Sequence, residues 1–381
     1  MSAVRRWRES ASLIILARTN KIVGNDSNYK VILLTNILLD VTAKFAHFTP
    51  QVLGFKRSEN TAFMPNHTVF PGGACDASDQ MSEWMGHFKN LGVTDRRLSE
   101  LTKLENSKSN LLDLTIGLFN QINLTISREI SLRITAIRET FEELGVLICR
   151  KKHEIEKSSI HGSFEETFDR ETWQKAVHGD PKKFLQLCQE LEVVPDLWSL
   201  YEWSVWLTPA AFKRRFETAF FFVALDKVPD VIAEDTEVME HFWKSPEEYL
   251  DGYKKNEFWL PPPQVYELSR LSKLRDIDAA ARFAKGQNDR GSITLLPVMF
   301  NASDGVISVL VGDDLYPEDP NNCLEMSDKF AGETIASVRM KAKRVHRIEL
   351  KGGKSVGCWL NFEQYNGHLS PVLDEVSGSK L

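Results

Sequence analysis

The chain has 381 residues, of which 42% are hydrophobic and 10% aromatic, enough for a large core. Its 47 basic and 53 acidic residues give a net charge of −6, so no overall positive field favours nucleic acid or an anionic membrane. Five scattered cysteines without a C-x-x-C pair argue for reduced thiols and against zinc, and no apolar run is long enough to span a membrane.

Strands and helices are expected to alternate along most of the chain. Runs rich in β-branched and aromatic residues predict strands at 11–18, 29–34, 66–71, 202–207, 217–225 and 237–243. Helical periodicity predicts helices through much of 82–125, and then at 131–144, 170–178, 181–192, 246–251 and 263–284. After Gly291, strands are expected at 295–300 and 306–311, joined by a hairpin turn at Asp304-Gly305. The order predicts an α/β or α+β fold in one elaborated domain.

A proline after an N-cap residue marks two of the helix starts. Asp180-Pro181 and Ser245-Pro246 each place an N-cap residue before a proline at the first helical position.

The most informative helix is the one expected to begin near Ser131 and to end at Gly145. Glu139, Glu142 and Glu143 are related by i, i+3 and i+4, so their side chains share one face, where like charges repel mildly. The opposite face is apolar, with Leu132, Ile134, Ile137, Phe141 and Leu144. A divalent cation such as Mg²⁺ would reverse the repulsion, because it takes oxygen ligands. The alternative is an ordinary solvated acidic face.

The run from Arg138 to Val146, preceded upstream by Phe70-Pro71-Gly72-Gly73, resembles the signature of the Nudix hydrolases. The resemblance implies the Nudix fold, a mixed β-sheet between helices, and cleavage of the diphosphate bond of a nucleoside diphosphate linked to another moiety. It also implies that Glu139, Glu142 and Glu143 hold Mg²⁺ or Mn²⁺ and help to activate water. Arg138 would orient Glu139, and the carbonyl group of Gly73 would complete the metal shell.

The chain departs from the usual signature in two places. Asp79 stands where the family has a glutamate, and its shorter side chain is expected to support the loop without reaching a metal. The spacer at 80–137 has 58 residues where the ordinary signature has about seven. Residues 35–55 are a further stretch that does not fit the family pattern. They are either a genuine loop or a retained intron in the gene model.

The long spacer points to one branch of the family, the peroxisomal coenzyme A diphosphatases of the Nudix motif 19 type. The likeness extends to residues 6–17, 63–73, 203–209, 214–221 and 259–264. The branch implies hydrolysis of coenzyme A and acyl-coenzyme A to (acyl-)4′-phosphopantetheine and adenosine 3′,5′-diphosphate. Two alternatives are a diphosphatase for another dinucleotide, such as NADH or ADP-ribose, and a catalytically weak binding protein with the same fold.

The resulting organisation is a Nudix hydrolase domain at 1–270 with a helical insertion at 80–130, a C-terminal helix and strand extension at 271–376, and a flexible tail at 377–381. The tail ends in Ser379-Lys380-Leu381, which is a peroxisomal address read by the import receptor. The expected location is therefore the peroxisomal matrix.

Other site residues are less sharply defined by the sequence. The general base is expected to be Glu139 or Glu237, with Glu240 close by; a solvated strand end is an equal alternative for the last two. Phosphate groups of the substrate need cationic donors, and the candidates are Arg57, Lys213, Arg214 and Arg215, each of which could also be an ordinary surface charge. The acyl-chain preference, the choice between Mg²⁺ and Mn²⁺, and the oligomeric state stay open.

Overall fold

A computed structural model of the chain describes residues 7–19, 50–61, 64–102, 126–352, 354–364 and 367–371. The strand expected at 29–34, residues 103–125 of the insertion and the targeting tripeptide lie outside the described residues. No helix within the described ranges is long and apolar enough to cross a membrane.

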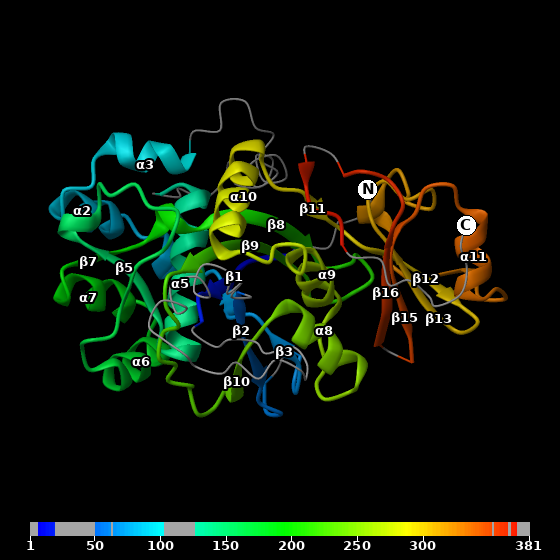
Figure 1. Cartoon of the computed structure of the whole chain (residues 1–381), viewed down its shortest axis with the longest axis horizontal. Helices are drawn as coiled ribbons and strands as arrows, with labels where there is room; N and C mark the ends of the chain where they lie inside the picture. Colours follow the sequence, from blue (N-terminus) through cyan, green and yellow to red (C-terminus); the bar gives the residue numbers. More distant parts are fainter. Residues whose placement is uncertain are drawn as a thin grey trace, which may run out of the picture.

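The central element is an eight-stranded sheet (Figure 1) with the order β10-β2-β1-β9-β8-β11, in which β3 also pairs with β2 and β4 with β1. Its strands are β1 (Arg8–Ala17), β2 (Gln51–Arg57), β3 (Thr68–Val69), β4 (Gly72–Ala74), β8 (Tyr201–Leu207), β9 (Phe216–Leu225), β10 (Val238–Lys244) and β11 (Thr294–Leu295). β1 runs parallel to β9 and antiparallel to both β2 and β4. The end of the 35–55 stretch is therefore a core strand, because Val52 pairs with Leu16.

Alternation along β1 gives the sheet two buried faces. Leu13 and Ile15 belong to the core shared with α5 (Arg128–Leu144), whereas Ile14 and Leu16 belong to the core shared with α9 (Pro262–Leu271) and α10 (Ile277–Arg290). Successive strand residues point to opposite faces, so an all-apolar strand is what a sheet covered on both sides requires. The expected mixed sheet between helices is confirmed.

The remaining helices surround this sandwich. They are α2 (Glu83–Asn90), α3 (Asp95–Thr102), α6 (Arg170–Gly179), α7 (Lys183–Glu190) and α8 (Pro246–Lys254), whereas α11 (Ile335–Lys341) packs on the C-terminal sheet described below. Short 3-10 turns are η1 (Ala77–Gln80), η2 (Lys152–Glu154), η3 (Leu197–Ser199) and η4 (Pro320–Asn322). The Ser245 cap of α8 is confirmed, since its side chain accepts a hydrogen bond from the Glu248 amide.

Two helix predictions were wrong in detail. The single helix expected at 263–284 is two helices, because the Asp276 side chain accepts the Ala279 amide and starts a new helix there. Both halves have apolar periodicity, so their patterns merge in the sequence. The helix expected from Pro181 begins at Lys183, and Asp180 instead accepts the amide of Lys182 in the preceding turn.

The described part of the insertion packs into the main core. Trp84 and Phe88 of α2 and Leu98 and Leu101 of α3 belong to the same cluster as the apolar face of α5. The helical insertion expected at 80–130 is therefore not a separate unit at α2 and α3, because these two helices share the main core. A small sheet of β5 (Leu147–Lys151), β6 (Phe164–Glu165) and β7 (Val193–Pro195) lies at the same end of the molecule as α2 (Figure 1).

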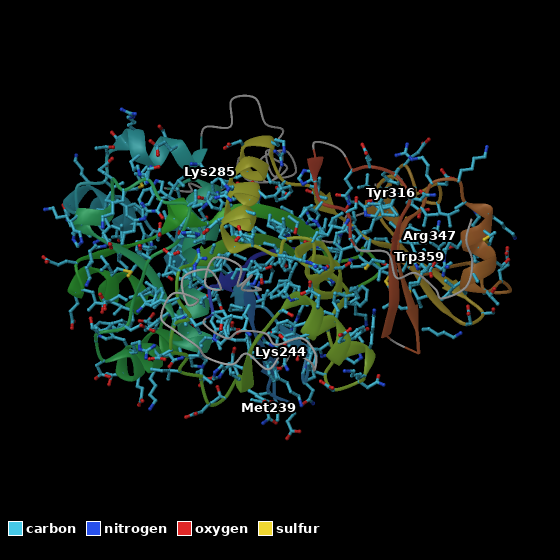
Figure 2. The ribbon with its side chains drawn as sticks, viewed as in Figure 1. Met239, Lys244, Lys285, Tyr316, Arg347 and Trp359 are labelled. Atoms are coloured by element: carbon cyan, nitrogen blue, oxygen red, sulfur yellow. The ribbon has the colours of Figure 1, made fainter. Side chains whose placement is uncertain are left out.

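The C-terminal part forms a second, five-stranded sheet with the order β14-β12-β13-β15-β16. Its strands are β12 (Val298–Ala302), β13 (Gly305–Val309), β14 (Ser327–Phe330), β15 (His346–Lys351) and β16 (Lys354–Leu360). The hairpin at Asp304-Gly305 is confirmed by the pairing of Ala302 with Gly305. Figure 2 shows Arg347 and Trp359 in this part of the molecule, well apart from Met239 on β10. β11 still completes the central sheet beside β8, and Ile348 and Cys358 of the second sheet share a core with α9, so the boundary expected at residue 270 stays a prediction.

Candidate active site

The helix that carries the signature, α5, is almost wholly buried. It begins at Arg128, three residues before the expected start, and ends where Gly145 takes the left-handed conformation (φ 64°) and donates its amide to the Phe141 carbonyl. Glu142 and Glu143 are only 8% and 3% exposed. The alternative of a solvated acidic face is therefore wrong, because other parts of the chain cover the glutamates.

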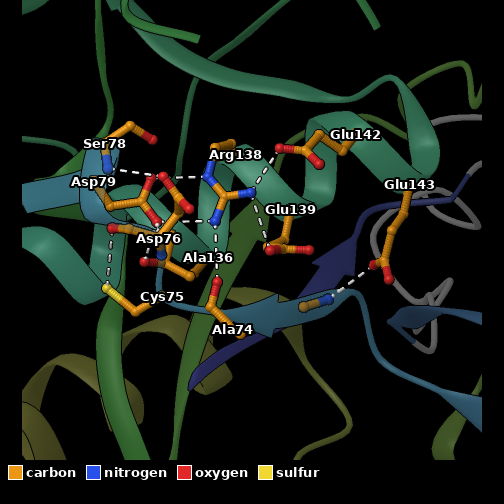
Figure 3. Close-up of polar contacts among 12 residues, drawn as sticks. Ala74, Cys75, Asp76, Ser78, Asp79, Ala136, Arg138, Glu139, Glu142 and Glu143 are labelled. Atoms are coloured by element: carbon orange, nitrogen blue, oxygen red, sulfur yellow. Dashed lines mark hydrogen bonds and ion pairs between the residues drawn. The ribbon is translucent and has the colours of Figure 1, made fainter. Parts of the chain in front are cut away.

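Arg138 is the centre of the site (Figure 3). Its guanidinium donates from Nε and Nη2 to the two carboxylate oxygens of Asp79, both at 2.8 Å, and from Nη2 to the carbonyl oxygen of Ala74 at 3.2 Å. Its Nη1 lies 3.0 Å from Glu139 and 2.6 Å from Glu142. These five contacts match the five N–H donors of an arginine, so Arg138 is fully engaged within the protein.

Asp79 ties the glycine loop to α5. Besides the pair with Arg138, its carboxylate accepts the hydroxyl group of Thr135 at 2.7 Å and the amide of Asp76 at 3.0 Å. Asp79 is 1% exposed and is held entirely by these partners. The expectation that the shorter carboxylate supports the loop agrees with this geometry.

The two glycines lie against the glutamates despite the 58-residue spacer. The Gly72 amide donates to Glu143 at 2.9 Å, with φ of 148°, and a Cβ there would lie 2.3 Å from the carbonyl oxygen of Ala11. A Cβ at Gly73 would lie 2.3 Å from an oxygen of Glu139. Gly72 must be glycine because its close contacts are backbone atoms, whereas a side chain at Gly73 would displace the Glu139 carboxylate. The turn and the acidic face therefore form one unit.

A second arginine gathers the remaining carboxylates. Nη1 of Arg57 lies 3.4 Å from Glu143, and its Nη2 lies 3.9 Å from Glu237. Glu237 is brought here by the preceding loop, in which the amides of Ile232 and Glu234 donate to the carbonyl groups of Leu144 and Glu143. Arg138 therefore holds Glu139 and Glu142, and Arg57 holds Glu143 and Glu237.

The carboxylates open onto a cavity of about 250 Å³. The residues that line it come from β4, the loop after it, α5, the α6–α7 segment and the loop before β10: Ala74, Asp76, Arg138, Glu139, Glu142, Glu143, His178, Pro181 and Glu237. Five of these nine carry a carboxylate and one carries a permanent positive charge. The cavity is therefore strongly acidic and suited to a cation.

Burial and the charges of neighbouring carboxylates raise the pKa values of the three glutamates on α5. Burial raises the pKa of Glu139 to about 7 against the pull of Arg138, and the neighbouring charge of Glu142 adds to the rise. Burial likewise raises the pKa of Glu142 to about 7, and it raises the pKa of Glu143 well above its usual range. A bound cation would favour the ionised forms instead.

The donor set fits a hard divalent cation, because every candidate ligand is an oxygen atom. Within the described part of the chain, no three His, Cys, Asp or Glu side chains are gathered closely enough to hold an ion as they stand. Arg138 and Arg57 occupy oxygens that a cation would need, at 2.6–3.4 Å. Metal binding therefore requires the glutamate carboxylates to move closer together.

The other arginines expected to bind substrate lie elsewhere. Arg215 is 2% exposed, donates to the Thr208 carbonyl at 2.9 Å and stacks on Trp7 at 5.3 Å. It is a packed structural residue, so its expected role in binding phosphate is not supported. Arg214 is exposed and does not line the cavity, and neither does Glu240. Of the arginines proposed for substrate, only Arg57 lies beside the acids.

Sequence reasoning missed Asp76, His178 and Pro181 as cavity residues. Asp76 is close to the glycine signature and could have been included on that ground. His178 and Pro181 are more than thirty residues beyond the acidic helix and carry no local motif, so their place depends on how α6 packs.

Comparison with known proteins gives consistent results along the whole chain. A family model described as the NUDT19 Nudix domain matches residues 7–271, and one described as the NUDT19 C-terminal domain matches residues 299–359. The chain is 33% identical over 403 residues, with 100% of both chains covered, to a Xenopus laevis protein named acyl-coenzyme A diphosphatase NUDT19. It is 31% identical to the Gallus gallus protein of the same name, with 99% of this chain and 97% of that one covered.

A solved structure also matches the fold. It is a NUDIX hydrolase from Alicyclobacillus acidocaldarius, with a TM-score of 0.50 and 18% identity. The match covers 74% of this chain and 97% of that one, and it supports the fold alone.

Proposed function

The chain belongs to the NUDT19 type of Nudix hydrolases, and we propose that it cleaves the diphosphate bond of coenzyme A and acyl-coenzyme A. The products are 4′-phosphopantetheine or its acyl form, and adenosine 3′,5′-diphosphate. The observation that carries this proposal is the full-length similarity to proteins named acyl-coenzyme A diphosphatase. The complete set of Arg138, Glu139, Glu142 and Glu143 around one cavity supports an active enzyme and argues against a catalytically weak binding protein.

We propose Mg²⁺ or Mn²⁺ as the cofactor, held by Glu139, Glu142, Glu143 and the carbonyl group of Gly73. When bound, such an ion neutralises the charge on the diphosphate oxygens and lowers the pKa of the attacking water. Arg138 holds Glu139 and Glu142 at 3.0 and 2.6 Å and so keeps these two side chains at the cavity wall.

Glu237 is the proposed general base, with Glu139 as the alternative. Glu237 lines the cavity and is 38% exposed, so water can reach it, and Arg57 holds it 3.9 Å away on the side of Glu143. A base in this place can accept a proton from a water molecule next to the glutamates. Arg57 orients both carboxylates and is the remaining candidate for contact with a phosphate group.

The proposal is tested by product analysis. Purified protein is incubated with coenzyme A, NADH and ADP-ribose at equal concentrations, with Mg²⁺ or Mn²⁺. Coenzyme A is expected to be cleaved fastest and to yield adenosine 3′,5′-diphosphate. Much faster cleavage of NADH or ADP-ribose would replace coenzyme A as the substrate, and no cleavage of any of the three would favour a binding protein.

The C-terminal Ser379-Lys380-Leu381 supports a place in the peroxisomal matrix, reached through the import receptor. Fatty acids enter matrix β-oxidation as coenzyme A esters, so a diphosphatase located in the matrix could control the concentration of these esters. That link is one of association between location and substrate.

A further inference from the structure

The active-site cavity offers an incoming diphosphate very few hydrogen-bond donors. Five carboxylates line it, and a diphosphate is itself an anion. Arg138 is the one lining residue with a permanent positive charge. All five of its N–H groups already contact Asp79, Glu139, Glu142 and the carbonyl group of Ala74. Among the side chains that line the cavity, only His178 has an N–H group that is not already used.

The position of His178 follows from the way α6 is attached to α5, beside which it packs (Figure 1). Arg170, Gln174 and His178 are spaced by four residues and so form one stripe along α6. Arg170 donates to the Asp230 carbonyl at 2.7 Å, and the buried Gln174 amide donates to the carbonyl groups of Glu142 at 2.9 Å and Ile232 at 2.8 Å.

His178, the third residue of this stripe, lies beyond the two residues that attach α6, Arg170 and Gln174. His178 lies one turn after Gln174, which is bonded to the backbone of Glu142, and its side chain lines the cavity together with Glu142 and Glu237. Its imidazole has no hydrogen-bond or ion-pair partner among the described residues, and it is exposed. It stands in the last turn of α6. Within the ranges that the structure describes, this donor is therefore unused.

We propose that His178 is a substrate-binding residue, whose imidazole N–H donates a hydrogen bond to a phosphate oxygen of the bound diphosphate. The inference rests on the proposed function and adds a contact to it from outside the Nudix signature. The α6–α7 segment then supplies a hydrogen-bond donor to a cavity whose carboxylates would otherwise repel the substrate.

The test compares His178→Ala and His178→Gln with His153→Ala, which removes an exposed histidine on η2 that does not line the cavity. Steady-state kinetics with coenzyme A give KM and kcat separately, and calorimetry with imidodiphosphate and Mg²⁺ gives a dissociation constant without turnover. His178→Ala is expected to raise both KM and this dissociation constant at least about tenfold, the effect of one hydrogen bond to a charged group. The change in kcat should stay within about threefold.

His178→Gln keeps an N–H donor and should restore most of the lost affinity, whereas His153→Ala should behave as the wild type. The proposal is overturned if His178→Ala matches His153→Ala in KM and in diphosphate affinity, or if it lowers kcat alone. A wild type that binds imidodiphosphate through His178 but does not cleave coenzyme A would leave the inference standing and refute the proposed function.

Discussion

The substitution Glu143→Gln is expected to weaken metal binding while leaving the stability of the metal-free fold almost unchanged. Glu143 is 3% exposed, accepts the Gly72 amide at 2.9 Å and lies 3.4 Å from Arg57. Because burial raises the pKa of Glu143 well above its usual range, the metal-free protein favours the neutral acid, which glutamine resembles in size and charge. The free energy of unfolding without metal should therefore change by no more than about 1 kcal/mol, the net contribution of one hydrogen bond.

Saturating Mg²⁺ should stabilise the wild type more than Glu143→Gln. A ligand at one hundred times its dissociation constant stabilises the folded state by about 2.7 kcal/mol, and the wild type is expected to gain this amount. Glu143→Gln should gain less than about 1 kcal/mol at the same concentration, since it loses one charged ligand. Turnover of coenzyme A should fall by about two orders of magnitude or more, because each 1.36 kcal/mol of lost transition-state stabilisation costs about tenfold.

The assay is urea unfolding with a chelator or with saturating Mg²⁺, together with the rate of coenzyme A hydrolysis. Glu156→Gln is the matched control, because Glu156 is exposed and does not line the cavity. Near-native turnover of Glu143→Gln, or a Mg²⁺ stabilisation equal to that of the wild type, would refute the assignment of Glu143 to the metal. A large loss of stability without metal would refute the reasoning about its neutral form.

Three further outcomes are expected. Burial raises the pKa of Glu139 and Glu142 from 4.5 to about 7, so the metal-free protein should lose stability as pH rises from about 4.5 to about 7. Urea titrations across this range should show the fall, and Mg²⁺ should remove it; a flat metal-free profile would contradict the cited shifts. Asp79→Asn should lower the free energy of unfolding by about 2–4 kcal/mol, because it breaks a buried ion pair while Arg138 keeps two other carboxylates, and an unchanged urea midpoint would count against this. Deletion of residues 379–381 should leave kcat/KM unchanged and move a fluorescent fusion to the cytosol, whereas retention in peroxisomes would remove the proposed address.

Local patterns predicted the elements and the acidic helix well. The spacing of Glu139, Glu142 and Glu143 places them on one face of α5, and Ser245-Pro246 marks the start of α8. Each of these features depends on a few residues close together in the sequence. The glycine turn is a similar case, because Gly72 approaches the backbone of Ala11 too closely for a side chain and Gly73 lies against the Glu139 carboxylate.

Tertiary packing decided the features that were predicted wrongly. The burial of Glu143 depends on Arg57 and on the glycine turn, which are far from it in the sequence. Arg215 resembled a phosphate ligand because arginine is suited to that role, yet its side chain is buried against Trp7. His178 enters the cavity only because α6 is hydrogen-bonded to the end of α5, and no short pattern in the sequence reports such an attachment.

The link between Asp79 and α5 also bears on how the chain can carry so long an insertion. Thr135 and Arg138 bind Asp79 at 2.7–2.8 Å, so they pin together the two ends of the 58-residue stretch at 80–137. In polymer terms, the entropy lost on closing a flexible loop grows only with the logarithm of its length. Lengthening the loop from about seven residues to 58 raises the free energy of loop closure by about 2 kcal/mol. One buried hydrogen bond to a charged group stabilises the folded state by roughly the same amount. Once these ends are joined, further length between them adds little to the loop-closure entropy, so an insertion here need not disturb the contacts of Asp79 with α5.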